Sequence, residues 1–444
     1  MKNLLYIVFL FVFVSACSTK PENKPYSWDD DLHRRLLTDF CLTESQVKDY
    51  IRKYIPDVTD EQMRQWEASN ALECMVLDGE KRYFRNAGPN LFRVDSACYD
   101  IKIAKEGTAL SGSEKVNKEN LPEVIAAVKK ENKAIVAPKR MRVTYTLTVD
   151  TNAVPAGKLV RCWLPYPRTD QTRQRDVKFI SASEPDYVFS PQECRHSTLY
   201  MEKRAVQREP TVFSETFEYT SCGEWHNLRA EDVLPYDTTT ALYKEYTAER
   251  EKHIVFSPRL RELAAKLTAG ETNPYLKAKR IFRWINDHFP WASAREYSTI
   301  ENIPEYVLDN RHGDCGQVSL LFITLCRCSG IPARFQSGFM MHPRAWNLHD
   351  WAEVYFEGAG WVPVDQSFGI PTFADNPEEK MFFMGGIDSW RMIVNSDYSM
   401  PLVPEKKYPR SETVDFQRGE VEWEGGNLYF PQWSYHMDID YLNY

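Results

Sequence analysis

The sequence has no long hydrophobic run beyond residues 1–16 and no excess of positive charge. A membrane-spanning helix needs about 20 consecutive apolar residues, so the rest of the chain predicts no transmembrane segment. The formal net charge is -8, from 55 basic and 63 acidic residues, which gives a nucleic-acid partner little electrostatic support. Internal repeats and low-complexity tracts are missing too, which argues against a repeat architecture. The remaining composition, 43% hydrophobic and 27% charged, is typical of a folded chain of more than one domain.

Clusters of metal ligands are also missing. The chain has ten cysteines, but Cys326 and Cys328 lie two apart in an expected helix and so face different sides. His342 and His349 lack a third ligand. We therefore expect no metal and no cofactor. Eight cysteines remain after the two assigned below, and an even number permits disulfides in an exported protein without fixing their pairing.

The first residues have the features of an export signal. Met1-Lys2 gives a positive start, and the apolar run from Leu4 to Val14 is too short to span a bilayer. Val14-Ser15-Ala16-Cys17 resembles a bacterial lipobox, in which the cysteine receives lipid. We interpret residues 1–16 as a lipoprotein signal peptide, Cys17 as the lipidation site and residues 17–26 as a tether. An ordinary secretory signal with a chance cysteine is the alternative.

This anchor sets the expected location. Ser18 is not an inner-membrane retention signal of the aspartate type. We expect a lipid-anchored protein of the cell envelope, held in the outer membrane of a Gram-negative bacterium, on the periplasmic or the surface side.

Residues 27–137 predict a mostly helical accessory domain. Thr43 to Gln46 and Thr59 to Gln62 are capping boxes, each followed by apolar residues at helical spacing. Asp78-Gly79 between two apolar runs indicates a hairpin. Residues 105–120 are polar and predict a loop, and residues 120–137 predict a further helix.

The pattern changes at Pro138. Apolar residues alternate with polar ones from Met141 to Val149, as in a half-buried strand. Further strand-like runs at 158–164, 177–182, 197–204 and 213–220 predict a β-sandwich-like domain over 138–225. The alternative is a sheet that belongs to the catalytic domain.

The remainder is divided into 240–400, a catalytic domain that starts with helices, and 401–444, a C-terminal β extension. Ser257-Pro258 and Asn273-Pro274 are helix starts. Residues 413–430 within the extension predict a closing β-hairpin, which could roof the active-site cleft or complete a sheet.

Cys315 falls in the first turn of an amphipathic helix whose N-cap is Asp314. Free N–H groups and the positive end of the helix dipole favour a thiolate there, so we expect a lowered thiol pKa. A small buried core cysteine is the alternative interpretation.

His349 and Asp365 come together at one end of an expected hairpin. His349 opens one strand, Gly358-Ala359-Gly360 turns the chain, and Asp365 ends the returning strand. Simple pairing leaves the two about three residues out of step, roughly 10 Å along the strands. Pro363 cannot donate to the ladder, so an edge strand or a bulge there could correct the register.

Four blocks in the order and spacing of a known family surround these residues: Gly313-Asp314-Cys315, Gly330 to Arg334, His349 to Tyr355, and Gly360 to Asp365. Over about 280–370 the chain resembles the transglutaminase-like superfamily. The resemblance implies a papain-like core within an α+β fold, with Cys315 as nucleophile, His349 as base and Asp365 as the residue that orients the base. Asp350 departs from the pattern, which usually has a small or apolar residue there.

We interpret the chain as a cell-envelope lipoprotein, a cysteine protease-like enzyme that acts on amide or peptide bonds of a peptide or protein substrate through a thioester. Hydrolysis is favoured over cross-linking. The alternatives are a protein-glutamine transglutaminase, a papain-like cell-wall peptidase, or a binding lipoprotein that keeps the fold without catalysis. The sequence indicates no nucleic-acid partner and does not define the oligomeric state.

Overall fold

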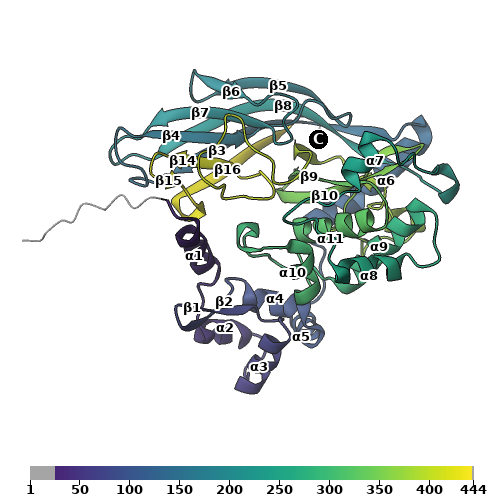
Figure 1. The fold of residues 1–444 in the computed structure, drawn as a ribbon, viewed down its shortest axis with the longest axis horizontal. Coiled ribbons are helices and arrows are strands. Elements are labelled where there is room, and N and C mark those ends of the chain that lie inside the picture. The colour runs from purple at the N-terminus through teal and green to yellow at the C-terminus, as the bar shows by residue number, and fades with distance from the viewer. Residues whose placement is uncertain (1–25, 443–444) are drawn as a thin grey trace, which may run out of the picture.

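The computed structural model describes residues 26–442. The signal peptide predicted at 1–16, the lipidation site Cys17 and nearly all of the tether at 17–26 lie outside the described residues. Within 26–442, none of the helices has the length and apolar character needed to cross a bilayer. The fold is α+β, as predicted, with a small helical unit below two packed sheets and a helix-rich region beside them (Figure 1).

The accessory unit has its own small core. Both predicted capping boxes are formed, Thr43 with Gln46 and Thr59 with Gln62. Asp78 and Gly79 turn the predicted hairpin with positive φ angles of 52° and 79°. The elements are α1 (Trp28–Asp39), α2 (Glu44–Ile51), α3 (Asp60–Ala68), β1 (Cys74–Leu77), β2 (Glu80–Tyr83), α4 (Ala87–Val94) and α5 (Ser96–Glu106).

The end of the predicted accessory domain differs from expectation. The loop expected over 105–120 is short, because a third capping box, Ser111 with Glu114, starts α6 (Gly112–Glu131). The helix expected to reach 137 ends at Glu131, and strand β3 (Ile135–Val149) begins before Pro138. Pro138 lies at a register shift in the ladder, where a missing N–H is tolerated.

Two antiparallel sheets pack face to face and form the predicted sandwich. Alternating residues of β3, Tyr145 and Leu147 among them, point into the core with Trp163 from the other sheet. The first sheet has the order β12-β8-β3-β16, with β5 paired to β8, and the second has the order β15-β14-β4-β7-β6. The strands within 138–225 are β4 (Leu159–Pro165), β5 (Gln174–Ala182), β6 (Tyr187–Phe189), β7 (Thr198–Arg204) and β8 (Thr211–Trp225).

Distant segments complete both sheets. The strands that join from outside 138–225 are β12 (Gly386–Ile387), β14 (Glu420–Trp423), β15 (Gly426–Asn427) and β16 (Trp433–Tyr441). The C-terminal strands therefore run beside β3 and β4 (Figure 1). Strand pairing over such sequence separations leaves no local pattern, so the sequence did not predict which strands pair with one another. The division of the chain into independently folding domains stays a prediction.

A separate antiparallel sheet of four strands, outside the sandwich, carries the candidate site. Its order is β11-β10-β9-β13, from β9 (Ala333–Met340), β10 (Asn347–Phe356), β11 (Gly360–Val364) and β13 (Arg391–Asn395). One face packs on α11 (Cys315–Cys328), and the other packs on the sandwich through residues such as Phe339 and Met392. Further helices are α7 (Ala241–Tyr246), α8 (Pro258–Leu267), α9 (Pro274–His288), α10 (Ile303–Asn310) and α12 (Pro377–Lys380).

Candidate active site

Cys315 is the first residue of α11, as predicted. The Asp314 carboxylate accepts a hydrogen bond from the Gln317 N–H at 3.1 Å, and the Gln317 Oε1 accepts one from the Asp314 N–H at 3.2 Å. This reciprocal cap fixes where the helix starts. It therefore also fixes where the thiol lies.

His349 and Asp365 are in direct contact. The His349 Nε2 atom is 2.8 Å from Asp365 Oδ2, and both side chains are buried. Burial lowers the pKa of His349, against the opposing influence of Asp365. Burial would raise the pKa of Asp365, but His349 and Arg391 hold it below its ordinary value. The pair is therefore a neutral imidazole bound to an ionised carboxylate near pH 7.

Three further donors hold the Asp365 carboxylate. The N–H groups of Ser367 and Phe368 donate to Oδ1 at 3.2 and 3.1 Å. The guanidinium of Arg391, fully buried on β13, lies 2.8 Å from Oδ2 and also pairs with Asp388. These three donors fix the orientation of the Asp365 carboxylate, which lies behind the pocket wall.

The hairpin brings His349 and Asp365 together without a bulge. Ala352 pairs with Val364 and Glu353 with Pro363 in regular register, which puts Asp365 one position beyond the ladder and two residues out of step with His349. The expected three-residue offset and the proposed bulge at Pro363 are wrong. Strand β11 is an edge strand, as the proline indicated, and its chain leaves the sheet at Asp365, where the N–H donates to Phe383 O.

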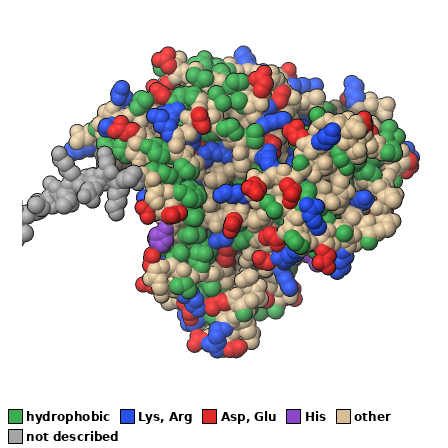
Figure 2. Space-filling model, viewed as in Figure 1, with side chains coloured by type: hydrophobic (Ala, Val, Ile, Leu, Met, Phe, Trp, Pro, Cys, Tyr) green, Lys and Arg blue, Asp and Glu red, His purple; other side chains and the backbone are tan. Residues whose placement is uncertain are grey.

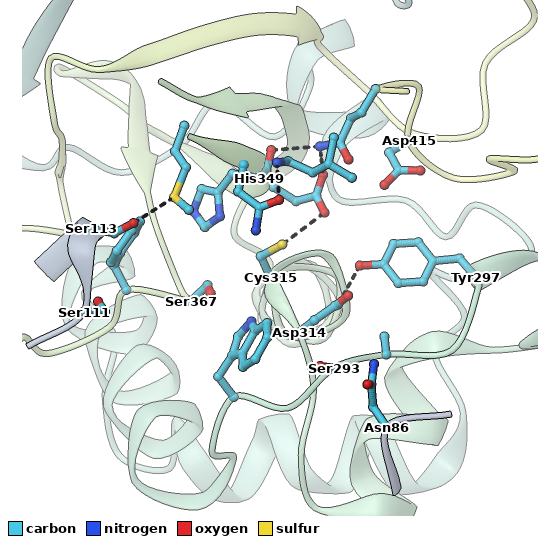
Figure 3. Close-up of a pocket in the computed structure, with 18 of the residues that line it drawn as sticks. Asn86, Ser111, Ser113, Ser293, Tyr297, Asp314, Cys315, His349, Ser367 and Asp415 are labelled. Carbon is cyan, nitrogen blue, oxygen red and sulfur yellow. Dashed lines mark hydrogen bonds between the residues drawn. The ribbon is translucent and has the colours of Figure 1, made fainter. Parts of the chain in front are cut away.

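A pocket of about 740 Å³ contains Cys315 and His349 in its wall. Figure 3 shows Cys315 at its centre, with Ser113 and Ser367 on one side and Tyr297 and Asp415 on the other. Figure 2 shows charged side chains of both signs gathered around the middle of the same face of the molecule as in Figure 1. The wall draws on the accessory unit, α6, the region 240–400 and the loop before β14.

The immediate partner of the thiol is a carboxylate. Cys315 Sγ donates to Asp350 Oδ2 at 3.4 Å (Figure 3). Burial, Asp350 and Asp314 raise the pKa of Cys315 well above its ordinary value. The expectation of a lowered thiol pKa is therefore wrong for this state of the site. The helix terminus that favours thiolate is outweighed by desolvation and by two nearby carboxyl groups.

Gln417 is a site residue that the sequence did not reveal. Its Nε2 group donates to Gly338 O at 2.9 Å, to His349 O at 3.0 Å and to Asp350 Oδ1 at 2.9 Å. It lies in the loop 401–419, which lines the pocket, whereas 420–441 completes the sandwich. Both roles considered for residues 413–430 are thus present in different parts of that segment. An isolated glutamine in a loop carries no sequence signal.

The accessory unit contributes to the pocket wall through ion pairs. Arg85 lies 3.2 Å from Glu296, and Arg418 lies 2.8 Å from the same carboxylate. Asn90 adds hydrogen bonds to the backbone of Ser293 in both directions, at 2.8 and 3.0 Å. The buried carboxylate of Glu296 therefore joins its own segment to those of Arg85 and Arg418, which are distant in sequence.

Two other titratable residues of this region, His312 and Glu353, have structural contacts. Burial lowers the pKa of His312 to about 4, and its ring packs against Tyr306 outside the pocket. Glu353 forms a buried ion pair with Arg334 at 2.7 Å. Among the nine cysteines that the structure describes, all are free thiols. Within 26–442 no group of three His, Cys, Asp or Glu side chains is arranged to hold a metal.

Comparison with known proteins matches residues 261–366 to the transglutaminase-like superfamily. YebA of Bacillus subtilis, described only as uncharacterized, is 27% identical over 130 residues, 25% of this chain and 18% of that protein. A protein-glutamine gamma-glutamyltransferase of Pseudomonas aeruginosa is 26% identical over 125 residues, 26% of this chain and 19% of that protein. A solved candidate cysteine protease of Cytophaga hutchinsonii has a TM-score of 0.47 at 16% identity, covering 70% of this chain and 93% of that chain. The chain thus spans less than a fifth of the length of these two curated relatives.

Proposed function

We propose that this chain is a cysteine-dependent enzyme that acts on amide or peptide bonds, because residues 261–366 form a transglutaminase-like domain. The observation that carries the proposal is the 2.8 Å contact between His349 and Asp365 beside a pocket that also contains the thiol of Cys315. In this assignment Cys315 is the nucleophile, His349 the base and Asp365 the orienting residue.

The first half of the reaction forms a thioester. His349 binds Asp365 through Nε2, which leaves Nδ1 to take the proton as Sγ attacks the carbonyl carbon. The new C–S bond places the negative charge on the carbonyl oxygen, where the Cys315 N–H at the start of α11 is a suitable donor. When the C–N bond breaks, the leaving amine takes the proton from the imidazolium.

The raised pKa of the Cys315 thiol fits a mechanism in which His349 takes the thiol proton as Sγ attacks. A thiol that stays protonated at rest needs a base at the moment of attack, and a neutral imidazole with a lowered pKa can supply it. Asp365 keeps its charge and stabilises the imidazolium that forms.

In the second half, water attacks the thioester with His349 again as base, and the products are a carboxylic acid and the free thiol. An amine in place of water would give a new amide. We favour hydrolysis, and the transferase named for the Pseudomonas relative supplies the alternative.

The test is a substrate screen that measures ammonia release, amine incorporation and peptide cleavage side by side. We expect peptide cleavage or ammonia release in the wild type and none in Cys315→Ala. Activity that survives in Cys315→Ala would reject the proposal, and amine incorporation alone would replace hydrolysis by acyl transfer.

We further propose that lipid on Cys17 anchors the enzyme in the outer membrane, as the lipobox-like sequence indicates. Cys17→Ala should release the signal-cleaved protein from membranes. Continued membrane association of that variant would contradict the anchor.

A further inference from the structure

Asp415 is a buried carboxylate on the pocket wall that the proposed chemistry does not use. It lies in the loop between β13 and β14, and its side chain is 7% exposed. Among residues 26–442 no hydrogen bond or ion pair engages this carboxylate, although its neighbours Glu412, Gln417 and Arg418 all have partners. A buried acceptor without a partner is costly, so such a group indicates a ligand.

The charges around Asp415 leave this side of the pocket short of cations. Arg418 is already paired with Glu296 and Glu412, and Arg85 with Asp39 and Glu296. Arg410 is near, but its guanidinium donates to Thr413 O and forms no ion pair with Asp415 within the described part of the chain.

Asp350 adds a second carboxyl group on the same side. Burial, Glu412 and Asp350 raise the pKa of Asp415 well above its ordinary value. A bound cation would offset that repulsion. The described carboxyl groups are not arranged as a metal site, which favours a compact organic cation with several N–H donors.

The position of Asp415 relative to the thiol indicates which part of a substrate it would meet. In Figure 3 Asp415 and His349 both lie above Cys315, His349 toward the side of Ser113 and Asp415 toward the side of Tyr297. The leaving amine takes its proton from His349 and therefore departs on the histidine side. A group held on the other side stays with the acyl portion of the substrate.

We propose that Asp415, with Asp350 beside it, forms a subsite for a primary ammonium group on the acyl portion of the substrate. The subsite rests on the proposed function and adds a substrate class to it: amides or peptides whose acyl part carries a free amino group. An ammonium seated there donates to Asp415 and favours the ionised form of its carboxyl group, against the burial and the neighbouring carboxyl groups that raise its pKa.

The test uses alkylation of Cys315, which needs no knowledge of the substrate. Bromoacetamides that carry a 2-aminoethyl or 4-aminobutyl chain are compared with methyl-terminated isosteres of the same length. In each reaction the C–S bond forms, the C–Br bond breaks, bromide leaves, and the thiol proton passes to His349 or solvent. Peptide mapping by mass spectrometry follows Cys315 separately from the other cysteines.

We expect the wild type to react about tenfold faster with the ammonium reagent of suitable length than with its isostere, as one charge-assisted hydrogen bond allows. Asp415→Asn should reduce this ratio to near one. Asp375→Asn removes a carboxylate from an exposed position outside the pocket and should keep the wild-type ratio.

A wild-type ratio near one at both lengths would overturn the subsite, and so would an unchanged ratio in Asp415→Asn. If Asp415→Asn does not fold, the ratio of the two alkylation rates in the wild type still tests the subsite. Failure of every reagent to alkylate Cys315 would instead overturn the proposed function, and the subsite with it.

Discussion

Cys315 is subject to two opposing influences on its thiol. The start of α11 favours the thiolate, whereas burial and the carboxyl groups of Asp350 and Asp314 favour the thiol. Position in a helix can be predicted from sequence, but desolvation and a neighbour on another strand cannot. The net direction is therefore a property of the folded site.

This balance predicts the pH dependence of Cys315. Because its pKa is raised, the alkylation rate with neutral iodoacetamide should still be rising above pH 9, the ordinary thiol range. Asp350→Asn removes one of the carboxyl groups and should speed alkylation at pH 7 by roughly tenfold. A rate that levels off below pH 8 in the wild type, or no gain in Asp350→Asn, would contradict this assignment.

Asp365 is expected to act through His349 alone. Asp365→Asn keeps a hydrogen-bonding group but loses the charge that stabilises the imidazolium, so kcat should fall. His349→Ala should cost more, about 10²–10⁴-fold, because it removes the base. Steady-state kinetics on a substrate from the screen measures both, with Asp375→Asn as a control that keeps its kcat. An Asp365→Asn enzyme with wild-type kcat and pH profile would remove Asp365 from the mechanism.

Among single residues of the site, the three proposed for catalysis were predicted from sequence, because they lie within contiguous blocks with a family pattern. Arg391, Gln417 and Asp415 were not, since each reaches the site from a strand or loop far along the chain. Their local sequence resembles that of any buried or loop residue.

Among the secondary-structure elements, α1 makes an unexpected connection to the region 240–400. Asp39 at its end is fully buried, lies 3.1 Å from Arg85 and accepts a hydrogen bond from the Glu296 N–H at 2.8 Å. Burial, opposed by Arg85 and reinforced by Glu296, raises the pKa of Asp39 from 3.8 to about 6. Its ionisation therefore opposes folding.

The sign of this linkage gives a test. A carboxyl whose folded pKa is raised contributes stability that is full below about pH 4 and is lost as the pH rises through about 6. The unfolding free energy of the wild type, minus that of Asp39→Asn, should fall by up to about 3 kcal/mol between pH 4 and pH 7. Urea denaturation at the two pH values measures it, and the exposed Asp57→Asn should show no such difference. A difference in unfolding free energy that stays constant or rises with pH would show that the charge of Asp39 does not destabilise the folded state.

Elements with strong local signals were predicted well. The capping boxes of α2 and α3, the Asp78-Gly79 hairpin and the alternation in β3 each fix a short-range geometry. The start of α6 was missed, although Ser111 and Glu114 form a capping box of the same kind, because the polar residues around them indicated a loop.

On the scale of the whole molecule, contacts between segments distant in sequence build the pocket. The accessory unit and the rest are linked by an exposed connection at 107–111, yet they meet through Arg85, Asn90 and Glu296. The sequence could suggest separate units but not their interface, because an interface of single ion pairs has no periodicity.

Limited proteolysis should reflect this arrangement. A protease specific for small residues should cut first within 107–111 and before any site in 280–370, and the two fragments should still co-elute on size exclusion. The matched comparison is Arg85→Ala, which removes the ion pairs to Asp39 and Glu296 and should promote fragment separation. First cleavage within 280–370 would contradict this view of the molecule.

The most direct test of the account is whether an acyl group is transferred to Cys315. With p-nitrophenyl acetate, Sγ should form a thioester, p-nitrophenolate should leave, and mass spectrometry should find the acetyl group on the Cys315 peptide. We predict fast acylation in the wild type, slow acylation in His349→Ala and no acyl group at this position in Cys315→Ala. Equal acylation of wild type and His349→Ala, or p-nitrophenolate release that survives in Cys315→Ala at the wild-type rate, would contradict the assignment of Cys315 and His349 as nucleophile and base.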